Sequence, residues 1–146
     1  INTRSGETPK FNDPMLNKQW HYKNTGDETL VSPIKEGCDI NVEPAWEFCT
    51  GDPSIIVAVM DEGVMYKHED LAANMWVNQA ELNGQKGVDD DGNGYVDDVY
   101  GYNFAKDQGD ITWTDPEDSG HGTHVAGTIS AVNNNGIGVC GIAGGS

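Results

Sequence analysis

The eight residues Gly120–Gly127, with the sequence GHGTHVAG, constrain the fold of this chain more than any other stretch. Half of them are glycine or alanine, and such small residues let a helix approach a neighbouring sheet closely. Apolar side chains at Val125, Ile129 and Val132 recur at spacings of four and three, which predicts a helix from about His121 to Val132. Asn and Gly residues follow directly and are typical of a helix end.

A second constraint comes from Ile55–Met60, a continuous apolar run that follows the turn sequence Thr50–Pro53. Such a run is typical of a buried strand in a parallel sheet. Asp61 follows at its carboxyl end, the edge at which open α/β sheets place their chemistry. Val99–Phe104 predicts a second strand, and Ile137–Ala143 predicts a third strand or a loop leading to one. We therefore expect an α/β fold, a three-layer sandwich around a mostly parallel sheet, with only its N-terminal half present.

Asp61 and His121 together suggest a hydrolytic site. Peptide hydrolysis by a serine enzyme needs a nucleophilic hydroxyl, a histidine base and a carboxylate that orients the imidazole ring. Val57–Gly63 and Gly120–Gly127 together resemble the first two catalytic blocks of the subtilisin-like serine proteases, the subtilases. In that family the aspartate precedes the histidine, as it does here. The resemblance implies that His121 is the general base and that Asp61 holds its ring.

The resemblance covers nearly the whole chain, but the third block, which carries the nucleophilic serine, is absent from these 146 residues. Ser146 has none of that block around it. We expect residues 1–37 to form an N-terminal arm and residues 38–146 the N-terminal half of a catalytic domain. The parent protein is then expected to be a secreted, calcium-stabilised serine endopeptidase, and this chain alone to be inactive. The alternative is a non-catalytic calcium-binding interaction module on the same half-fold, which would have no chemical need for both Asp61 and His121.

Glu62 departs from the family pattern, which usually has serine or threonine after the catalytic aspartate. A second carboxylate beside Asp61 would raise the pKa of Asp61 if it pointed inward. We expect it to point to solvent instead.

The segment Asp89–Asp98 resembles the start of an EF-hand loop, because Asp89, Asp91 and Asn93 place oxygen side chains at alternate positions. Gly94 would permit the sharp turn. The predicted calcium ligands are the side chains of Asp89, Asp91 and Asn93, the carbonyl of Tyr95, and a last carboxylate from Asp97 or Asp98, of which we choose Asp98. The twelfth position would be Tyr100, so a complete EF-hand is excluded.

A second calcium set is implied by the family resemblance alone. Many subtilases hold calcium between the N-terminal arm, an acid after the catalytic aspartate and the loop after the histidine helix. The matching positions are the side chains of Asp13, Asp70 and Asn134 and the carbonyls of Val132, Ile137 and Val139. An extra residue in this loop leaves Asn135 as an alternative to Asn134. A weaker third candidate is Asn103, Asp107 and Asp110.

The charge pattern limits the partners of the chain. With 8 basic and 24 acidic residues the formal net charge is −16, which argues against nucleic acid and against an anionic membrane surface. No apolar run approaches the roughly 18 residues of a membrane span. The expected partners are a polypeptide substrate and the missing C-terminal part of the domain, in a secreted, periplasmic or cell-surface location. Cys38 and Cys49 are close enough in sequence to pair, or all three cysteines are reduced and buried.

Overall fold

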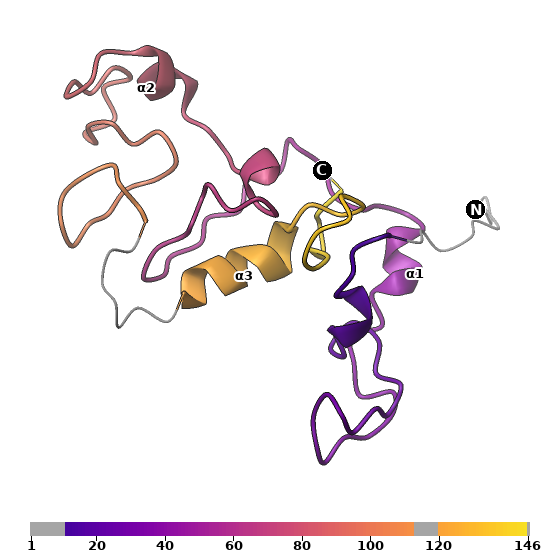
Figure 1. Ribbon diagram of the computed structural model, residues 1–146. Helices are drawn as coiled ribbons and strands as arrows, with labels where there is room; N and C mark the ends of the chain where they lie inside the picture. The colour runs from indigo at the N-terminus through magenta and orange to yellow at the C-terminus, as the bar shows by residue number, and fades with distance from the viewer. Residues whose placement is uncertain (1–10, 113–119, 146) are drawn as a thin grey trace. The chain divides into compact units, whose positions relative to one another are not determined.

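The computed structural model describes residues 11–112 and 120–145, which contain three α-helices and two short 3₁₀ helices (Figure 1). In chain order these are η1 (Leu16–Lys18), α1 (Glu43–Trp46), η2 (Ala72–Asn74), α2 (Gln79–Asn83) and α3 (His121–Ser130). The chain divides into two compact units. The first comprises Ile1–Ile55 with Gly127–Ser146, and the second comprises Ile56–Ala126. The predicted division at residue 37 stays a prediction.

The first unit has an aromatic core built from Tyr22, Val42, Trp46 and Cys140, against which Phe11 and Leu16 pack. Trp46 lies at the end of α1, whose first turn contains a proline, where the missing N–H would have no partner within the helix anyway. The rings of Tyr22 and Phe11 contact Trp46 edge-on, with centroids 5.6 and 5.0 Å away. The Tyr22 hydroxyl donates to the Cys140 carbonyl at 2.8 Å, and burial raises the pKa of Tyr22 to about 12.

The second unit has a smaller core of Val64, Leu71 and Ala126, with Val59, Met75 and Ile111 packed beside it. Ala126 belongs to α3, so this core fixes the first half of that helix against the segment that follows Asp61. α2 begins where the Asn78 side chain accepts a hydrogen bond from the backbone N–H of Ala80 at 3.2 Å. The sequence analysis did not predict α2.

The predicted strands are not formed in the described residues. Their sole β pairing there is an isolated antiparallel bridge between Asn103 and Gln108. In the predicted strand before Asp61, Ile55 is 70 % exposed and Met60 is 96 % exposed. A parallel strand is stable only with neighbours on which to form its hydrogen-bond ladder, and residues 11–112 and 120–145 supply none. The parallel sheet therefore remains unconfirmed.

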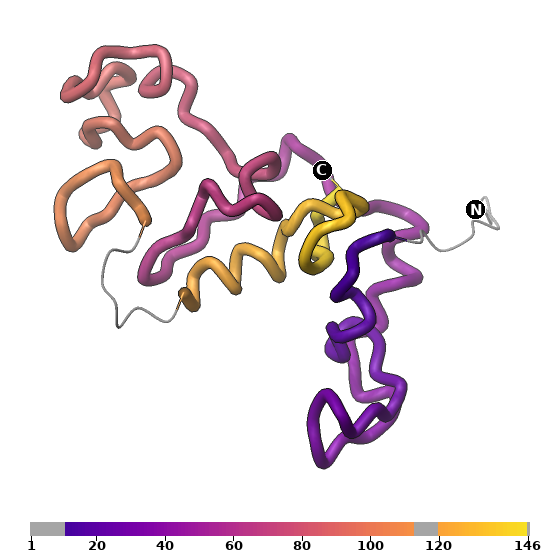
Figure 2. The backbone as a smooth tube through the Cα atoms, viewed as in Figure 1, coloured from indigo at the N-terminus to yellow at the C-terminus, as the bar shows by residue number. Residues whose placement is uncertain are grey.

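The helix predicted at His121 is confirmed, but it ends at Ser130 rather than Val132. The following residues fold back beside the last turns of α3 (Figure 2). There the N–H groups of Gly141, Ile142 and Ala143 donate to the carbonyls of Ala131, Thr128 and Ile129. These hydrogen bonds satisfy carbonyl groups at the end of the helix. Residues 137–143 therefore form a loop against the helix and not a strand.

The three cysteines are free, so of the two alternatives the pairing of Cys38 with Cys49 is not formed. The alternative of three buried thiols is correct only for Cys140, because Cys38 and Cys49 are exposed.

The aromatic core predicts a large difference between two otherwise similar substitutions. Trp46→Ala removes a ring that is 4 % exposed and should lower the free energy of unfolding by about 3–5 kcal/mol. The matched control Phe48→Ala removes a ring that is 87 % exposed and should change it by less than about 0.5 kcal/mol. Urea denaturation of the chain measures both, and equal losses would contradict this assignment of the core.

Candidate functional site

Asp61 and His121 meet in the second unit. The Nδ1 atom of His121 lies 2.8 Å from Oδ2 and 3.0 Å from Oδ1 of Asp61, which are hydrogen-bond distances. The His121 side chain is 66 % exposed and that of Asp61 is 16 % exposed. With the proton assigned to Nδ1, the ring donates to Asp61 and its Nε2 atom remains able to accept a proton.

A close backbone approach brings this pair together. A Cβ atom on Gly122 would lie 2.2 Å from the carbonyl oxygen of Gly63 and 3.0 Å from the Cβ of Asp61. Glycine is therefore required at this position of α3. At the next residue of α3, the Thr123 hydroxyl accepts a hydrogen bond from the backbone N–H of Met65 at 2.9 Å. The first turn of α3 is thus fixed along the segment that begins at Asp61.

Hydrogen bonds keep Asp61 ionised. The backbone N–H of Glu62 donates to Oδ1 of Asp61 at 2.8 Å, and this bond, with the bond and charge of His121, holds the pKa of Asp61 below its ordinary value. Glu62 is exposed, as expected from the sequence. Its Oε1 atom accepts a hydrogen bond from the backbone N–H of His121 at 2.7 Å. The backbone N–H of Glu62 lowers the pKa of Asp61, whereas an inward-pointing carboxylate would have raised it.

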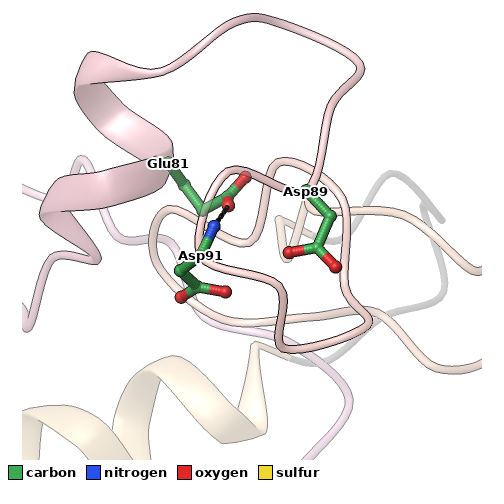
Figure 3. A group of neighbouring side chains, drawn as sticks. All are labelled: Glu81, Asp89 and Asp91. Atoms are coloured by element: carbon green, nitrogen blue, oxygen red, sulfur yellow. Dashed lines mark hydrogen bonds between the residues drawn. The ribbon is translucent and has the colours of Figure 1, made fainter.

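The acidic loop converges on a carboxylate that the sequence analysis missed. Among the described residues, Glu81, Asp89 and Asp91 form a group that could hold a metal ion, with one oxygen from each within 4.8 Å of the others. Figure 3 shows Glu81 reaching from α2 toward the two aspartates of the loop. Glu81 is 5 % exposed and accepts the backbone N–H groups of Asp90, Asp91 and Asp97 at 2.7, 3.3 and 2.9 Å. Asn78 and Glu81 have the spacing of a helix-capping pair, a signal that could have found this residue.

The structure separates the two candidates for the last carboxylate of the loop. Asp98 is buried and accepts the side-chain amides of Asn78 and Asn93 at 2.9 and 3.0 Å. Those same amides also donate to Asp91, at 2.8 and 3.1 Å. The Asp97 carboxylate instead accepts the backbone N–H of Gly87 at 3.0 Å. Asp98 therefore lies with the predicted ligands and Asp97 does not.

Backbone geometry organises the remaining loop positions. Gly94 has a φ of 95°, as expected for the sharp turn, and its N–H donates to Asp89 at 2.8 Å. That bond is the main cause of the lowered pKa of Asp89. The N–H of Tyr95 donates to the Asn93 side chain at 2.7 Å, and the predicted role of the Tyr95 carbonyl stays a prediction. The candidate metal ligands are oxygen atoms, and backbone N–H groups orient them by hydrogen bonding. Oxygen ligands suit a hard cation such as calcium.

The second predicted calcium set has members in both units. In the first unit, buried Asp13 accepts the backbone N–H groups of Asn134 and Asn135 at 2.7 and 3.3 Å. It also accepts from the Cys140 thiol at 3.2 Å. Asp70 is buried in the second unit. The ligand roles of Asp13, Asp70 and the Asn134 side chain, and of the carbonyls of Val132, Ile137 and Val139, stay predictions.

The residues of the weaker third set bond locally. Asn103 accepts the backbone N–H groups of Ala105 and Lys106, Asp107 accepts the Tyr102 hydroxyl, and Asp110 accepts both donors of Thr112. Each of the three therefore stabilises its own turn. Ser146 lies outside the described residues.

Comparison with known proteins relates these features to one family. A family model described as "Subtilase family" matches residues 52–146. Subtilisin-like protease 1 of Plasmodium vivax is 44% identical over 135 residues, which are 92% of this chain and 19% of that protein. Human neuroendocrine convertase 2 is 35% identical over 132 residues, which are 90% of this chain and 17% of that protein.

A solved structure is also similar. The crystal structure of the Aeromonas sobria serine protease in complex with a chaperone matches with a TM-score of 0.62 and 31% identity, over 91% of this chain and 18% of that one. This chain thus spans less than a fifth of the length of these relatives. In the described part of the chain, every helix is too short or too polar to cross a membrane.

The close approach at Gly122 predicts opposite effects for two glycine substitutions in α3. Gly122→Ala should separate the helix start from Asp61 and cost about 1–3 kcal/mol of stability. Gly127→Ala is the matched control, because a Cβ atom there meets nothing within 4 Å, and removing glycine from a helix interior should stabilise by about 0.5–1 kcal/mol. Thermal unfolding measures both, and a tolerated Gly122→Ala would contradict the contact.

The hydrogen bonds to Asp61 predict a pKa below the ordinary value of 3.8. A depressed carboxyl pKa stabilises the fold at pH values above the unfolded pKa, and this stabilisation is lost as the pH falls through the folded pKa. Carboxyl-carbon NMR titration of the chain measures the value. Because the Glu62 N–H is the largest cause, the pKa should remain below 3.8 in His121→Ala. A return to 3.8 in that variant would show that the imidazole is the main cause.

Proposed function

Because the chain belongs to the subtilase family of serine proteases, we propose that it is the N-terminal part of the catalytic domain of a serine endopeptidase. The observation that carries the proposal is the hydrogen bond between Asp61 and Nδ1 of His121. It supplies two of the three groups that a serine protease needs. The fold of the parent domain is then a three-layer α/β sandwich with a mostly parallel sheet.

In this mechanism His121 acts as the general base. Its Nε2 atom takes the proton from a serine hydroxyl as that oxygen attacks the peptide carbonyl, and then gives the proton to the leaving amine. Asp61 stays ionised, because hydrogen bonds lower its pKa, and it stabilises the imidazolium that forms. The serine would come from the length of the parent protein that this chain does not cover. The substrate would be a polypeptide.

We also propose that calcium binds the acidic loop of the second unit. The side-chain ligands would be Asp89, Asp91, Asn93 and Asp98, with the carbonyl of Tyr95 and with Glu81 added by the geometry. Calcium would neutralise carboxylates that are close together and so stiffen the loop. Asp13 and Asn134, with Asp70, Val132, Ile137 and Val139, remain the proposed second set. The proposed location is secreted, periplasmic or cell surface.

The catalytic proposal predicts the effect of two substitutions in the parent protein. Asp61→Asn and His121→Ala should each lower kcat by about 10⁴-fold or more, because both act with the serine as one unit. Asp27→Asn is the control, since Asp27 is likewise an aspartate in a turn, hydrogen-bonded to Thr29, and should leave kcat unchanged. Hydrolysis of a chromogenic peptide measures all three, and the isolated chain should show no hydrolysis. Activity retained by His121→Ala would contradict the proposal.

The calcium proposal predicts a rise in melting temperature when EDTA is replaced by millimolar calcium. At a hundredfold excess over the dissociation constant the stabilisation is about 2.7 kcal/mol. Glu81→Gln and Asp89→Asn should each reduce the shift. Asp27→Asn removes one exposed charge at a residue of no proposed calcium set and should leave the shift unchanged. An equal shift in all variants would contradict binding at this loop.

A further inference from the structure

Among the described residues, α3 has no capping side chain at the position before it. Its first residue is His121, and the residue before it, Gly120, has a φ of 68° and no side chain to accept a hydrogen bond. The first N–H groups of any helix have no partner within the helix, and a side-chain oxygen at the preceding position normally accepts one of them. In α3 a side chain from a distant described segment accepts one of these N–H groups.

Glu62 provides this acceptor from the segment that follows Asp61. Its Oε1 atom accepts the backbone N–H of His121 at 2.7 Å. A carboxylate at this end of a helix is favoured twice, by a charge-assisted hydrogen bond and by the partial positive charge of the helix terminus. The glutamate therefore does for α3 what a capping residue ordinarily does, from a position far away in sequence.

Three hydrogen bonds close a ring through the same histidine. Asp61 accepts from the imidazole at 2.8 Å, Glu62 accepts from the backbone of His121 at 2.7 Å, and the backbone of Glu62 donates to Asp61 at 2.8 Å. Both the main chain and the ring of His121 are thus fixed relative to one dipeptide. A shift of the helix start along its axis would stretch the hydrogen bond that Glu62 accepts from the backbone of His121. The bond between Asp61 and the imidazole could be kept by rotation of the His121 side chain.

We propose that Glu62 is a positioning residue for His121, acting through the first N–H of α3 rather than through the imidazole or the substrate. This inference rests on the function proposed above, in which His121 is the base. Without the Glu62 carboxylate the first turn of α3 frays, and the imidazole spends less time where it can take the proton from serine. The loss falls on kcat and leaves KM unchanged, because the substrate does not contact Glu62.

Amide hydrogen exchange in this chain tests the cap without any catalysis. In Glu62→Ala the His121 N–H should exchange at least several-fold faster than in the unchanged chain. Glu62→Gln keeps an oxygen acceptor at the same distance along the side chain and should restore most of the protection. Glu69→Ala, at another exposed glutamate of the same unit, is the control and should have no effect. An unchanged exchange rate in Glu62→Ala overturns the inference.

Kinetics of the parent protein test the consequence. Glu62→Ala should lower kcat by about 2- to 30-fold, the range expected for loss of a helix cap, with KM unchanged. Glu62→Gln should recover most of kcat, and Glu69→Ala should match the unchanged enzyme. A rise in KM with kcat intact overturns the inference, because it places Glu62 against the substrate. Equal losses in Glu62→Gln and Glu62→Ala also overturn it, because the acceptor would then not be what matters.

The two proposals can fail separately. If the unchanged parent protein has no peptidase activity, or if His121→Ala retains it, the proposed function fails, whereas hydrogen exchange still decides whether Glu62 caps α3. If the parent is active and His121→Ala is not, unchanged kcat in Glu62→Ala overturns the positioning role alone.

Discussion

The second unit depends on the contact between the segment that begins at Asp61 and the first turn of α3. The absence of a side chain at Gly122 allows the two backbones to approach each other. Hydrogen bonds accepted by the side chains of Asp61, Glu62 and Thr123 then fix the register of the two segments. The core contact of Val64 with Ala126 lies along the same pair of segments. The Asp61–His121 pair and the core of the second unit therefore rely on the same interface. A substitution that disturbs the core should also disturb the pair.

The acidic composition explains how the candidate sites are built. With 24 acidic and 8 basic residues, most carboxylates cannot find a cationic partner, and a buried or crowded carboxylate needs some compensation. Backbone N–H groups provide it repeatedly, at Asp13, Asp61, Glu81 and Asp89. Such bonds require particular turns, which is why positive φ values occur at Gly94 and Asn134. A divalent cation would add the charge that the side chains lack.

The strands show where local sequence is insufficient. Ile55–Met60 has the apolar, β-branched composition of a buried strand, yet no ladder forms among the described residues, because a strand depends on neighbours that may come from anywhere in a protein. Helices need no such partner for their hydrogen bonds. The start of α3 at His121 was accordingly predictable from its local pattern, although its end was moved from Val132 to Ser130 by the fold-back of the next segment.

The sequence alone was enough to identify the family, through two short blocks, and to predict the pairing of Asp61 with His121. It also located the acidic loop, because the alternation of Asp89, Asp91 and Asn93 is a local pattern. Tertiary packing brought Glu81 to the loop, placed Asp98 with the other predicted ligands and turned the Glu62 carboxylate onto the His121 backbone. Each of these depends on where a side chain from one segment meets a backbone from another. The spacing of residues along the sequence does not specify such contacts, because they are set by the packing of the whole unit.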